Sequence, residues 1–269
     1  MKPERIPAVL AKIEEEIRKN VDIATIGVSG GADSTLVTII CMRALGPDNV
    51  YVQHMPYDNY DISDGRFNMR SLVLTEYLGI KHSKLTWIGD TCEAMFAQFD
   101  RPGHRQTSEL NKGNTRSRMR MVALYLYNQH ISEEFQGEKR CRVMGTGNIS
   151  EDFIGYDTKG GDALCDLFPI GSLFKSEVYQ LLDYFVKQGY INEQHIDRIP
   201  SAGLWEGQTD EDEIGFTYNE MEPYIRHYLT TGEWDESTPC GKEVKRRHYI
   251  NAHKHQAPAV IEIRDFIDK

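Results

Sequence analysis

The sequence contains no run of about 18 consecutive apolar residues, so we expect no membrane-spanning helix and no membrane partner. Its first 20 residues are broken by two prolines and several acids, where a secretory signal needs an uninterrupted apolar stretch. No internal repeat, low-complexity segment or long Pro/Gly/Ser linker divides the chain. We therefore expect the 269 residues to form a globular, cytoplasmic protein.

Cysteine and basic residues are both scarce. The five cysteines are widely spaced and form no C-x-x-C pair, so we expect free thiols in a reducing compartment. The nine histidines form no H-x-x-x-H or H-E-x-x-H pattern, and His253 and His255 flank Lys254 without an evident third metal ligand. Lys and Arg together number 31 against 41 Asp and Glu, for a formal net charge of -10. This balance argues against a nucleic-acid partner, and any anionic ligand must meet a local basic cluster.

Short apolar, β-branched runs alternate with helical patterns. Strands are expected at residues 23–28, 50–52, 84–88 and 141–144, and the last interval has room for two helices. This alternation predicts the α/β class, with a doubly wound, mainly parallel sheet flanked by helices. Acidic residues crowd the stretch after about residue 205, where no strand is evident, so we expect a helical C-terminal region. We expect one domain over 1–269, with a nucleotide-binding core to about residue 200 and a mostly helical extension over about 201–269.

Helices are expected near residues 7–19, 115–129 and 175–188. Two of them show apolar side chains at i, i+3, i+4 and i+7, the spacing of one helix face. The two sets are Met119, Val122, Ala123 and Leu126, and Val178, Leu181, Leu182 and Phe185.

The strongest chemical signal follows the first expected strand. It is the loop Gly27, Val28, Ser29, Gly30, Gly31, Ala32, Asp33 and Ser34. A strand, a glycine turn and a helix start direct backbone N–H groups and the positive helix end at an anion such as phosphate. Asp33 would repel phosphate unless a cation lay between them, which predicts Mg²⁺. The loop lacks the lysine of the Walker sequence and does not match G-x-G-x-x-G.

This S-G-G-x-D-S loop resembles the pyrophosphate-binding loop of the N-type ATP pyrophosphatases, which cleave ATP between its α- and β-phosphates. Further segments recur in the same order in ammonia-dependent NAD synthetases, and the similarity extends from about residue 26 to about 258. These segments are residues 111–121, 145–151, 158–175, 200–211 and 253–254. The resemblance implies an adenine nucleotide alpha hydrolase-like fold and the amidation of deamido-NAD with ammonia. ATP would be consumed through an acyl adenylate, giving NAD, AMP and pyrophosphate.

The resemblance also assigns residues to roles. ATP binding is assigned to the loop residues together with Thr146, Lys175 and Ser201. Deamido-NAD binding is assigned to Arg118, Lys159, Asp166, His253 and Lys254. Lys175 would act in catalysis by neutralising charge on the departing pyrophosphate, and Asp162 would bind ammonium. Glu151 follows a strand end as Asp33 does, so the two carboxylates are the expected Mg²⁺ ligands. The family forms homodimers.

Some residues depart from the family or carry a separate expectation. His54 stands where relatives often carry arginine, so one contact to ATP is expected to differ. The segment 159–166 has fewer glycines than in many relatives, which leaves the role of Asp162 open. Arg118 borders the apolar face of its helix and is expected to reach a ligand, whereas Arg116 and Arg120 are expected on a solvated face.

Two further questions concern the nitrogen donor and the alternatives. About 25 residues precede the first strand, which leaves no room for the amidase domain of glutamine-dependent relatives. Ammonia, free or delivered by another protein, is therefore the expected donor. One alternative function is another superfamily enzyme, such as a tRNA-modifying thiolase or lysidine synthetase, which the acidic net charge and scattered cysteines oppose. A non-catalytic nucleotide-binding module would not need Asp33, Glu151 and Lys175 together.

Overall fold

A four-stranded parallel sheet forms the centre of the protein. The structure is a computed structural model that describes residues 1–57, 68–196 and 209–267. The strands are β1 (Ile23–Gly27), β2 (Val50–His54), β3 (His82–Leu85) and β4 (Cys141–Met144), in the order β3-β2-β1-β4. Ala24 of β1 lies opposite Val50 of β2, and Ile23 lies opposite Cys141 of β4. The parallel sheet expected from the sequence is confirmed, with β1 and β2 buried at its centre.

The third strand lies earlier than the sequence predicted. It covers His82–Leu85 rather than 84–88, and three of its four side chains are exposed. The prediction was wrong because an edge strand needs no apolar run on both faces. The apolar residues after it pack elsewhere, since Ile88 precedes α5 (Gly89–Phe99) and is buried with Met55, Cys92 and Phe96.

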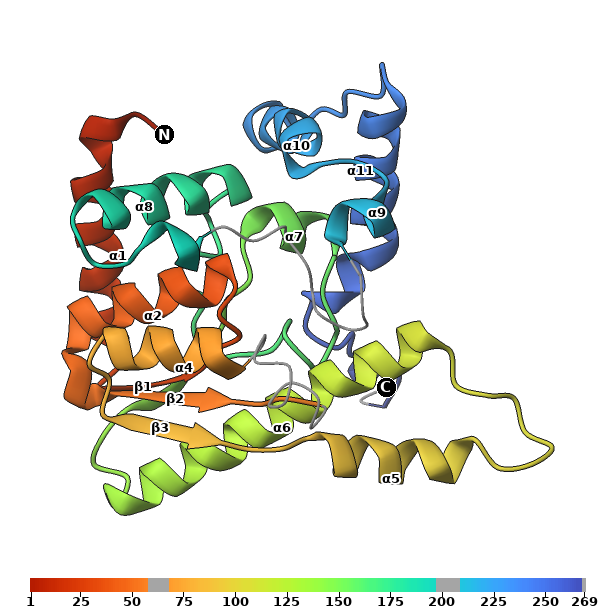
Figure 1. The fold of residues 1–269 in the computed structure, drawn as a ribbon. Helices are drawn as coiled ribbons and strands as arrows, with labels where there is room; N and C mark the ends of the chain where they lie inside the picture. Colours follow the sequence, from red (N-terminus) through yellow and green to blue (C-terminus); the bar gives the residue numbers. More distant parts are fainter. Residues whose placement is uncertain (58–67, 197–208, 268–269) are drawn as a thin grey trace.

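Helices cover both faces of the sheet, as the doubly wound prediction requires. One face carries α2 (Ala32–Leu45), with α1 (Ile6–Asn20), α4 (Asn68–Tyr77) and α8 (Lys175–Lys187) beside it, and the other carries α5 and α6 (Glu109–Glu134) (Figure 1). The apolar face of α8 is confirmed, because Val178, Leu181, Leu182 and Phe185 are all fully buried. Short 3₁₀ turns at Pro3–Arg5, Pro47–Asn49 and Glu193–His195 accompany these elements.

The expected apolar face of α6 is confirmed only in part. Met119 and Ala123 pack against the core around Met55 and Cys92, but Val122 is 49% exposed and Leu126 57% exposed. The buried positions of the helix are Gly113, Ser117, Leu124 and Ile131, so α6 turns a mixed face to the sheet and leaves some apolar side chains outside. The helix is also longer than expected, because Ser108 caps its N-terminus by accepting a hydrogen bond from the Asn111 N–H.

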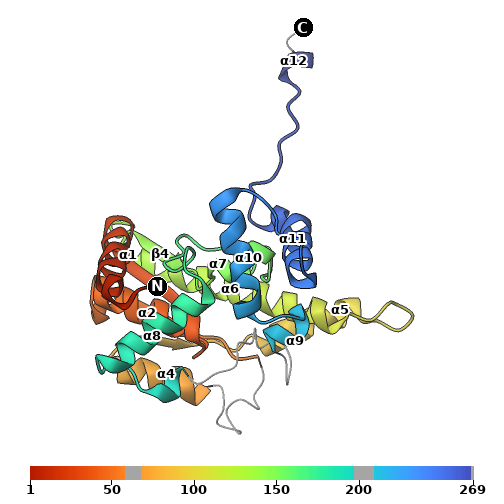
Figure 2. The ribbon, with the colours of Figure 1, turned by 90° about the horizontal axis from the view of Figure 1, so that it is seen from above.

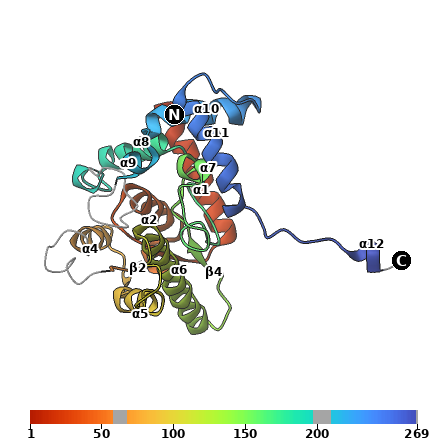
Figure 3. The same cartoon turned by 90° about the vertical axis from the view of Figure 1, so that its right-hand side faces the viewer.

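The C-terminal part of the described chain is helical, as expected. It comprises α9 (Asp210–Ile214), α10 (Tyr218–Thr231), α11 (Pro239–Asn251), the 3₁₀ turn Ala252–Lys254 and α12 (Arg264–Ile267). With α7 (Ile149–Ile154), helices α9, α10 and α11 enclose a second apolar core that includes Met221, Ile225 and Val244. The chain after the 3₁₀ turn runs away from the body as an arm, as Figures 2 and 3 show. We call residues 256–267 the C-terminal arm.

Two findings bear on the absences noted in the sequence. Within the described ranges, no helix is both long enough and apolar enough to cross a membrane. All five cysteines are free thiols, and every one except Cys165 is buried.

Candidate active site

The loop after β1, which we call the cradle loop (residues 27–34), has the backbone geometry expected of an anion-binding loop. Gly30 has a φ of +77°, and a Cβ there would lie 3.2 Å from the Ser71 backbone nitrogen, so the turn favours glycine. Gly31 begins α2 without a side-chain cap among the described residues, which leaves the first N–H groups of the helix available. The Ser29 hydroxyl accepts a hydrogen bond from the Gly31 N–H and contacts the Ser34 hydroxyl at 3.1 Å. The expected geometry of strand, glycine turn and helix start is confirmed.

Three charged groups meet beside this cradle. The Lys175 Nζ donates to the Asp33 carboxylate at 2.6 Å and to the Glu151 carboxylate at 2.8 Å. The Lys175 side chain is only 5% exposed, and those of Asp33 and Glu151 are 18% and 16% exposed. The groups come from the starts of α2, α7 and α8, which gather where β1 and β4 end. The sequence prediction that Asp33 and Glu151 lie together is confirmed by this geometry.

The electrostatics of this cluster suit a cation. Burial lowers the pKa of Lys175, but the charges of Asp33 and Glu151 outweigh burial and raise it, so the ammonium stays protonated. Burial is also the main cause that raises the pKa of the Glu151 carboxyl. Two carboxylate oxygens within 3 Å of one positive nitrogen are the hard oxygen donors that Mg²⁺ prefers. The donor set therefore fits the expected magnesium ion.

Several residues that the sequence did not single out hold the cluster in place. Asn148 caps α7 by accepting from the Ser150 and Glu151 N–H groups, and its amide donates to Asp33 at 3.1 Å. At the start of α8, the buried Glu222 accepts hydrogen bonds from the Ser150 hydroxyl and the Ser176 N–H. A cap signal was visible in Asn148, but its partner Asp33 lies 115 residues away.

Tyr218 is a further neighbour that sequence reasoning missed. Its buried ring lies 5.4 Å from the Lys175 Nζ, and its hydroxyl donates to Asp210 at 3.0 Å. Asp210 is also buried, at 3% exposure. The C-terminal helices α9 and α10 thus form one wall of the charged cluster.

Thr146 and Ser201 are the remaining expected ATP residues. Thr146 lies in the turn Gly145–Gly147 after β4, and β4 pairs with β1, so this turn adjoins the cradle loop. A Cβ at Gly145 would lie 2.5 Å from both the Cys165 Sγ and the Phe168 ring, so the turn has no room for a larger residue. Ser201 lies outside the described residues.

Most of the expected deamido-NAD residues form a second cluster. The exposed Arg118 on α6 donates through Nε to the Lys159 carbonyl at 3.1 Å. The Lys159 Nζ in turn donates to the His253 carbonyl at 2.6 Å. The Lys254 Nζ donates to the carbonyls of Gly155 and Asp157, at 2.6 and 2.7 Å. The 3₁₀ turn Ala252–Lys254 is thereby attached to the segment that follows α7.

Asp162 and Asp166 lie on the loop after this segment. The Asp162 Oδ1 accepts hydrogen bonds from the Ser117 hydroxyl at 2.7 Å and the Thr158 N–H at 2.9 Å. Asp166 instead accepts from the Val143 N–H of β4 and from the Tyr125 hydroxyl of α6. Asp166 therefore faces the middle of α6, one to two turns along from Arg118.

Two expectations for basic residues change with the structure. Arg116 and Arg120 are half-buried rather than solvated, because Arg116 stacks 3.9 Å from the Tyr57 ring centroid and Arg120 donates to the Met55 carbonyl. His54 is fully buried, with Nδ1 on the Ser71 hydroxyl and Nε2 on the Ser83 hydroxyl. Both ring nitrogens of His54 are thus engaged within the fold, and the expected difference in a contact to ATP stays a prediction.

Comparisons with known proteins agree with this geometry. The family model NAD synthase matches residues 6–257. The chain is 36% identical to the NH(3)-dependent NAD(+) synthetase of Methanocaldococcus jannaschii over 233 residues, which cover 84% of this chain and 82% of the relative. It is 33% identical to the enzyme of the same name from Methanosarcina acetivorans, over 93% of each chain.

Solved structures share the fold. An NMN synthetase from Francisella tularensis matches with a TM-score of 0.76 and 27% identity, over 97% of this chain and 99% of that one. The NH3-dependent NAD synthetase from Campylobacter jejuni, in complex with the nitrate ion, matches with a TM-score of 0.71 and 28% identity, over 97% and 100%. The doubly wound, adenine nucleotide alpha hydrolase-like fold implied by the sequence resemblance is thus confirmed. On the family match, the identities and this shared fold, the chain belongs to the NAD synthase family.

Proposed function

We propose that this member of the NAD synthase family uses ATP and ammonia to convert the nicotinate carboxylate of deamido-NAD into the amide of NAD. The observation that carries the proposal is the meeting of Asp33, Glu151 and Lys175 beside an anion cradle at the carboxyl edge of the sheet. A nucleotide-binding module alone has no need of two acids and a lysine buried at that point. The names of the curated relatives support ammonia as the nitrogen donor.

The chemistry follows from the weakness of a carboxylate as an acyl donor. Its oxygen attacks the α-phosphorus of ATP, the bond to pyrophosphate breaks, and the acyl adenylate forms. Ammonia then attacks the carbonyl carbon, loses a proton, and AMP leaves with the oxygen. Catalysis rests on alignment of the two substrates and on stabilisation of the charge that gathers on the departing pyrophosphate.

The residues of the cradle and Lys175 supply that stabilisation. We assign the N–H groups of Gly30, Gly31 and the start of α2 to phosphate oxygens, together with the hydroxyls of Ser29 and Ser34. We assign the Lys175 ammonium, which lies beside the loop in contact with Asp33 and Glu151, to the charge of the pyrophosphate. Mg²⁺, held by Asp33 and Glu151, would supply Lewis-acid polarisation of the phosphates.

The second substrate is assigned to the surface along α6. Arg118, Lys159 and His253 lie at one end of this path, and Asp166 lies further along it. Asp162 is assigned to ammonium, because a carboxylate beside the acyl group would hold the cation and accept its proton. Ser201 keeps its assignment to ATP from the family resemblance alone.

We further propose a homodimer that covers this surface. Val122 and Leu126 are exposed apolar side chains on α6, beside the proposed substrate path, and a second copy would remove them from water. The free thiols, most of them buried, fit a reducing compartment such as the cytoplasm.

The test is a product assay with purified protein, deamido-NAD, ATP, Mg²⁺ and ammonium. We expect NAD, AMP and pyrophosphate in equal amounts. Release of ADP in place of AMP, or no product at saturating substrates, would rule the proposal out. A parallel reaction with glutamine as the nitrogen source should give no NAD.

The mononucleotide analogue of the substrate is a second candidate, because an NMN synthetase is among the similar structures. The same assay run with nicotinate mononucleotide decides between them through the ratio of kcat/KM values. A higher kcat/KM for the mononucleotide would reassign the substrate while leaving the adenylation chemistry intact.

A further inference from the structure

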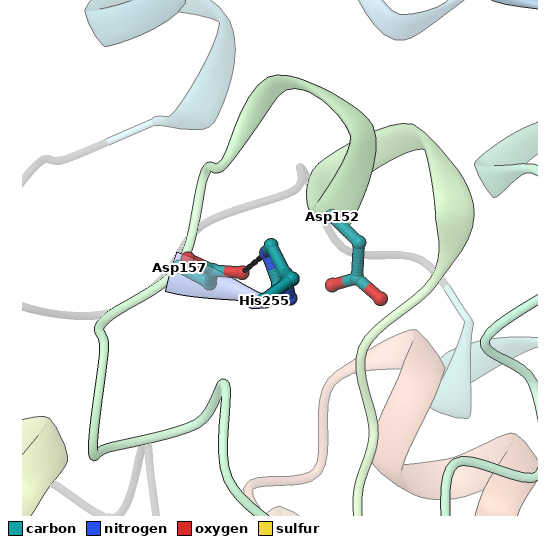
Figure 4. A group of neighbouring side chains, drawn as sticks. All are labelled: Asp152, Asp157 and His255. Carbon is teal, nitrogen blue, oxygen red and sulfur yellow. Dashed lines mark ion pairs between the residues drawn. The ribbon is translucent and has the colours of Figure 1, made fainter. Parts of the chain in front are cut away.

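A group of three metal-binding side chains lies next to the charged cluster and takes no part in the chemistry above. Asp152 is on α7, Asp157 lies in the turn after α7, and His255 follows the 3₁₀ turn Ala252–Lys254. One ligand atom from each lies within 4.8 Å of the other two. Figure 4 shows the His255 ring with the Asp157 carboxylate on one side and the Asp152 carboxylate on the other.

Asp157 is unusually placed for a carboxylate. Its side chain is only 4% exposed, yet neither oxygen accepts a hydrogen bond of ordinary geometry within the described chain. Its charge is balanced by ion pairs alone, with the His255 Nε2 at 2.5 Å and the Lys254 Nζ at 3.6 Å. Burial of a carboxylate without hydrogen bonds is unfavourable unless a cation compensates for it.

His255 and Asp152 complete a set of donors around this carboxylate. The His255 Nε2 faces the Asp157 carboxylate, and ligand atoms of all three residues lie within 4.8 Å of one another. The Asp152 Oδ1 lies against the turn after β4, since a Cβ at Gly147 would be 2.9 Å from it. The two carboxylates come from one short segment, whereas His255 comes from a segment about 100 residues later.

We propose that Asp152, Asp157 and His255 bind one divalent transition-metal ion of the zinc or cobalt class. The ion takes the place of the proton between His255 and Asp157, and that proton passes to solvent. Imidazole nitrogen with carboxylate oxygen is a donor set typical of Zn²⁺ and Co²⁺, whereas Mg²⁺ favours oxygen donors alone. In the sequence His255 had no evident further ligands, because its two carboxylate partners lie about 100 residues earlier in the chain.

The location suggests that the ion has a structural role. It would link α7 and the turn after it to residues 253–255, where the His253 carbonyl already accepts from the Lys159 Nζ and the Lys254 Nζ donates to the Gly155 carbonyl. The Lys254 ammonium is held by the Gly155 and Asp157 carbonyls, and so can remain while the ion binds. The site is independent of the proposed function, because none of its three ligands is assigned to a substrate.

The experiment is a Co²⁺ titration of the full chain, stripped of metal with a chelator and free of ATP. We expect one bound Co²⁺ per chain, with the visible absorption of a four- or five-coordinate ion, and displacement of Co²⁺ by Zn²⁺. Mg²⁺ at equal concentration should not displace it. Co²⁺ binding should weaken by about 100-fold or more in each of the variants His255→Gln, Asp157→Asn and Asp152→Asn. Loss of a metal ligand should cost more affinity than loss of a group that only hydrogen-bonds to a ligand.

Two controls separate this site from others. His253→Gln alters the exposed histidine two residues away and should retain the cobalt spectrum, and Asp33→Asn should retain it too. Absence of the spectrum in the wild type, its survival in His255→Gln, or its loss in Asp33→Asn would overturn the proposal. If Asp157→Asn does not fold, the comparison of His255→Gln with His253→Gln still decides the question. Both histidines are exposed, so neither substitution should disturb the fold.

Discussion

Lys175 provides the positive charge that pairs with both acidic side chains of the proposed ATP site. Without ligands it neutralises much of the charge of Asp33 and Glu151, two carboxylates that would otherwise repel each other in a poorly solvated position. In the proposed function, Lys175 has two roles: counter-ion of the two carboxylates and donor to the departing pyrophosphate.

Replacement of Lys175 by methionine should reveal both roles. Removal of one member of a buried ion cluster typically costs about 3–5 kcal/mol, because the remaining charge is left buried and unpaired. We expect Lys175→Met to lose about that much unfolding free energy in EDTA and to regain part of it in Mg²⁺. Turnover should fall by about 10²- to 10³-fold, the usual cost of losing one charge-stabilising donor.

The measurement is urea denaturation of both proteins with and without Mg²⁺. Mg²⁺ should stabilise Lys175→Met more than it stabilises the wild type. Ser172→Ala, a change in the loop before α8, serves as the control and should respond to Mg²⁺ as the wild type does. An equal response of Lys175→Met and wild type to Mg²⁺ would contradict the counter-ion role.

The sequence revealed individual residues where local pattern and chemistry agree. Asp33, Glu151 and Lys175 could be predicted because each follows a strand end or opens a helix, and parallel strands bring such positions together. Asn148 and Tyr218 could not, since their roles depend on contacts with residues far along the chain. Arg116 was misjudged because its aromatic partner Tyr57 lies on another element.

At the scale of secondary-structure elements, one ion pair connects the residue just before β1 with the residue just before β4. The Arg140 guanidinium donates to both oxygens of Asp22, at 3.0 and 2.7 Å, and the Arg140 N–H donates to Asp22 at 2.8 Å. Arg140 also reaches the last carbonyls of α1 at Arg18 and Lys19. One residue thus connects two strands and a helix end.

This connection predicts a pH-dependent contribution to stability. Hydrogen bonds from Arg140 lower the pKa of Asp22 to about 2, from a usual value near 3.8. A carboxyl with a lowered pKa stabilises the fold above its unfolded value and ceases to do so as pH falls through the folded one. Because the Asp22 side chain is 32% exposed, solvent screening reduces the effect, and we expect Asp22→Asn to cost about 1 kcal/mol at neutral pH.

Urea denaturation across the acid range provides the check. The difference between Asp22→Asn and the wild type should shrink as pH falls below about 4 and vanish near 2. Asp48→Asn is a matched control, since Asp48 forms an exposed pair with Lys81 and should change stability little. A difference that stays constant from neutral to acid pH would show that the ion pair is not its source.

Helix α6 shows where sequence patterns mislead at the scale of an element. The spacing predicted a helix correctly, but only half of its expected inner face packs inside: Val122 and Leu126 are exposed, because periodicity locates an apolar face without identifying what covers it. For α8 the same spacing identified the buried face, since that helix packs against α2 in the main core. The edge strand β3 was misplaced because its burial is low.

At the scale of the whole molecule, exposed apolar side chains occur on several helices, α4 and α6 among them, and on the C-terminal arm. In the arm, Val260 is 77% exposed and Ile261 is 85% exposed. Exposed apolar side chains grouped in this way favour contact with another chain. The proposed homodimer accounts for the surface on α6.

Substitution of Leu126 by aspartate tests that dimer. A charge at the centre of an apolar interface should weaken association strongly, whereas an exposed helix position in a monomer tolerates it within about 0.5 kcal/mol. We expect Leu126→Asp to sediment as a monomer at concentrations where the wild type sediments as a dimer. Leu229→Asp, at an exposed leucine of α10, should leave the oligomeric state unchanged. A monomeric wild type, or a dimeric Leu126→Asp, would refute the assignment.

The pairing of β1 with β4 also determines how late in synthesis the site can form. The cradle loop leaves the ribosome early, but the partner strand and Lys175 follow much later, with 142 positions separating Asp33 from Lys175. At about 5–20 residues per second, that interval lasts roughly 7 to 28 seconds. For most of it β1 lacks its neighbour β4, and for all of it Asp33 lacks its lysine, so the site is assembled only when synthesis is well past its midpoint.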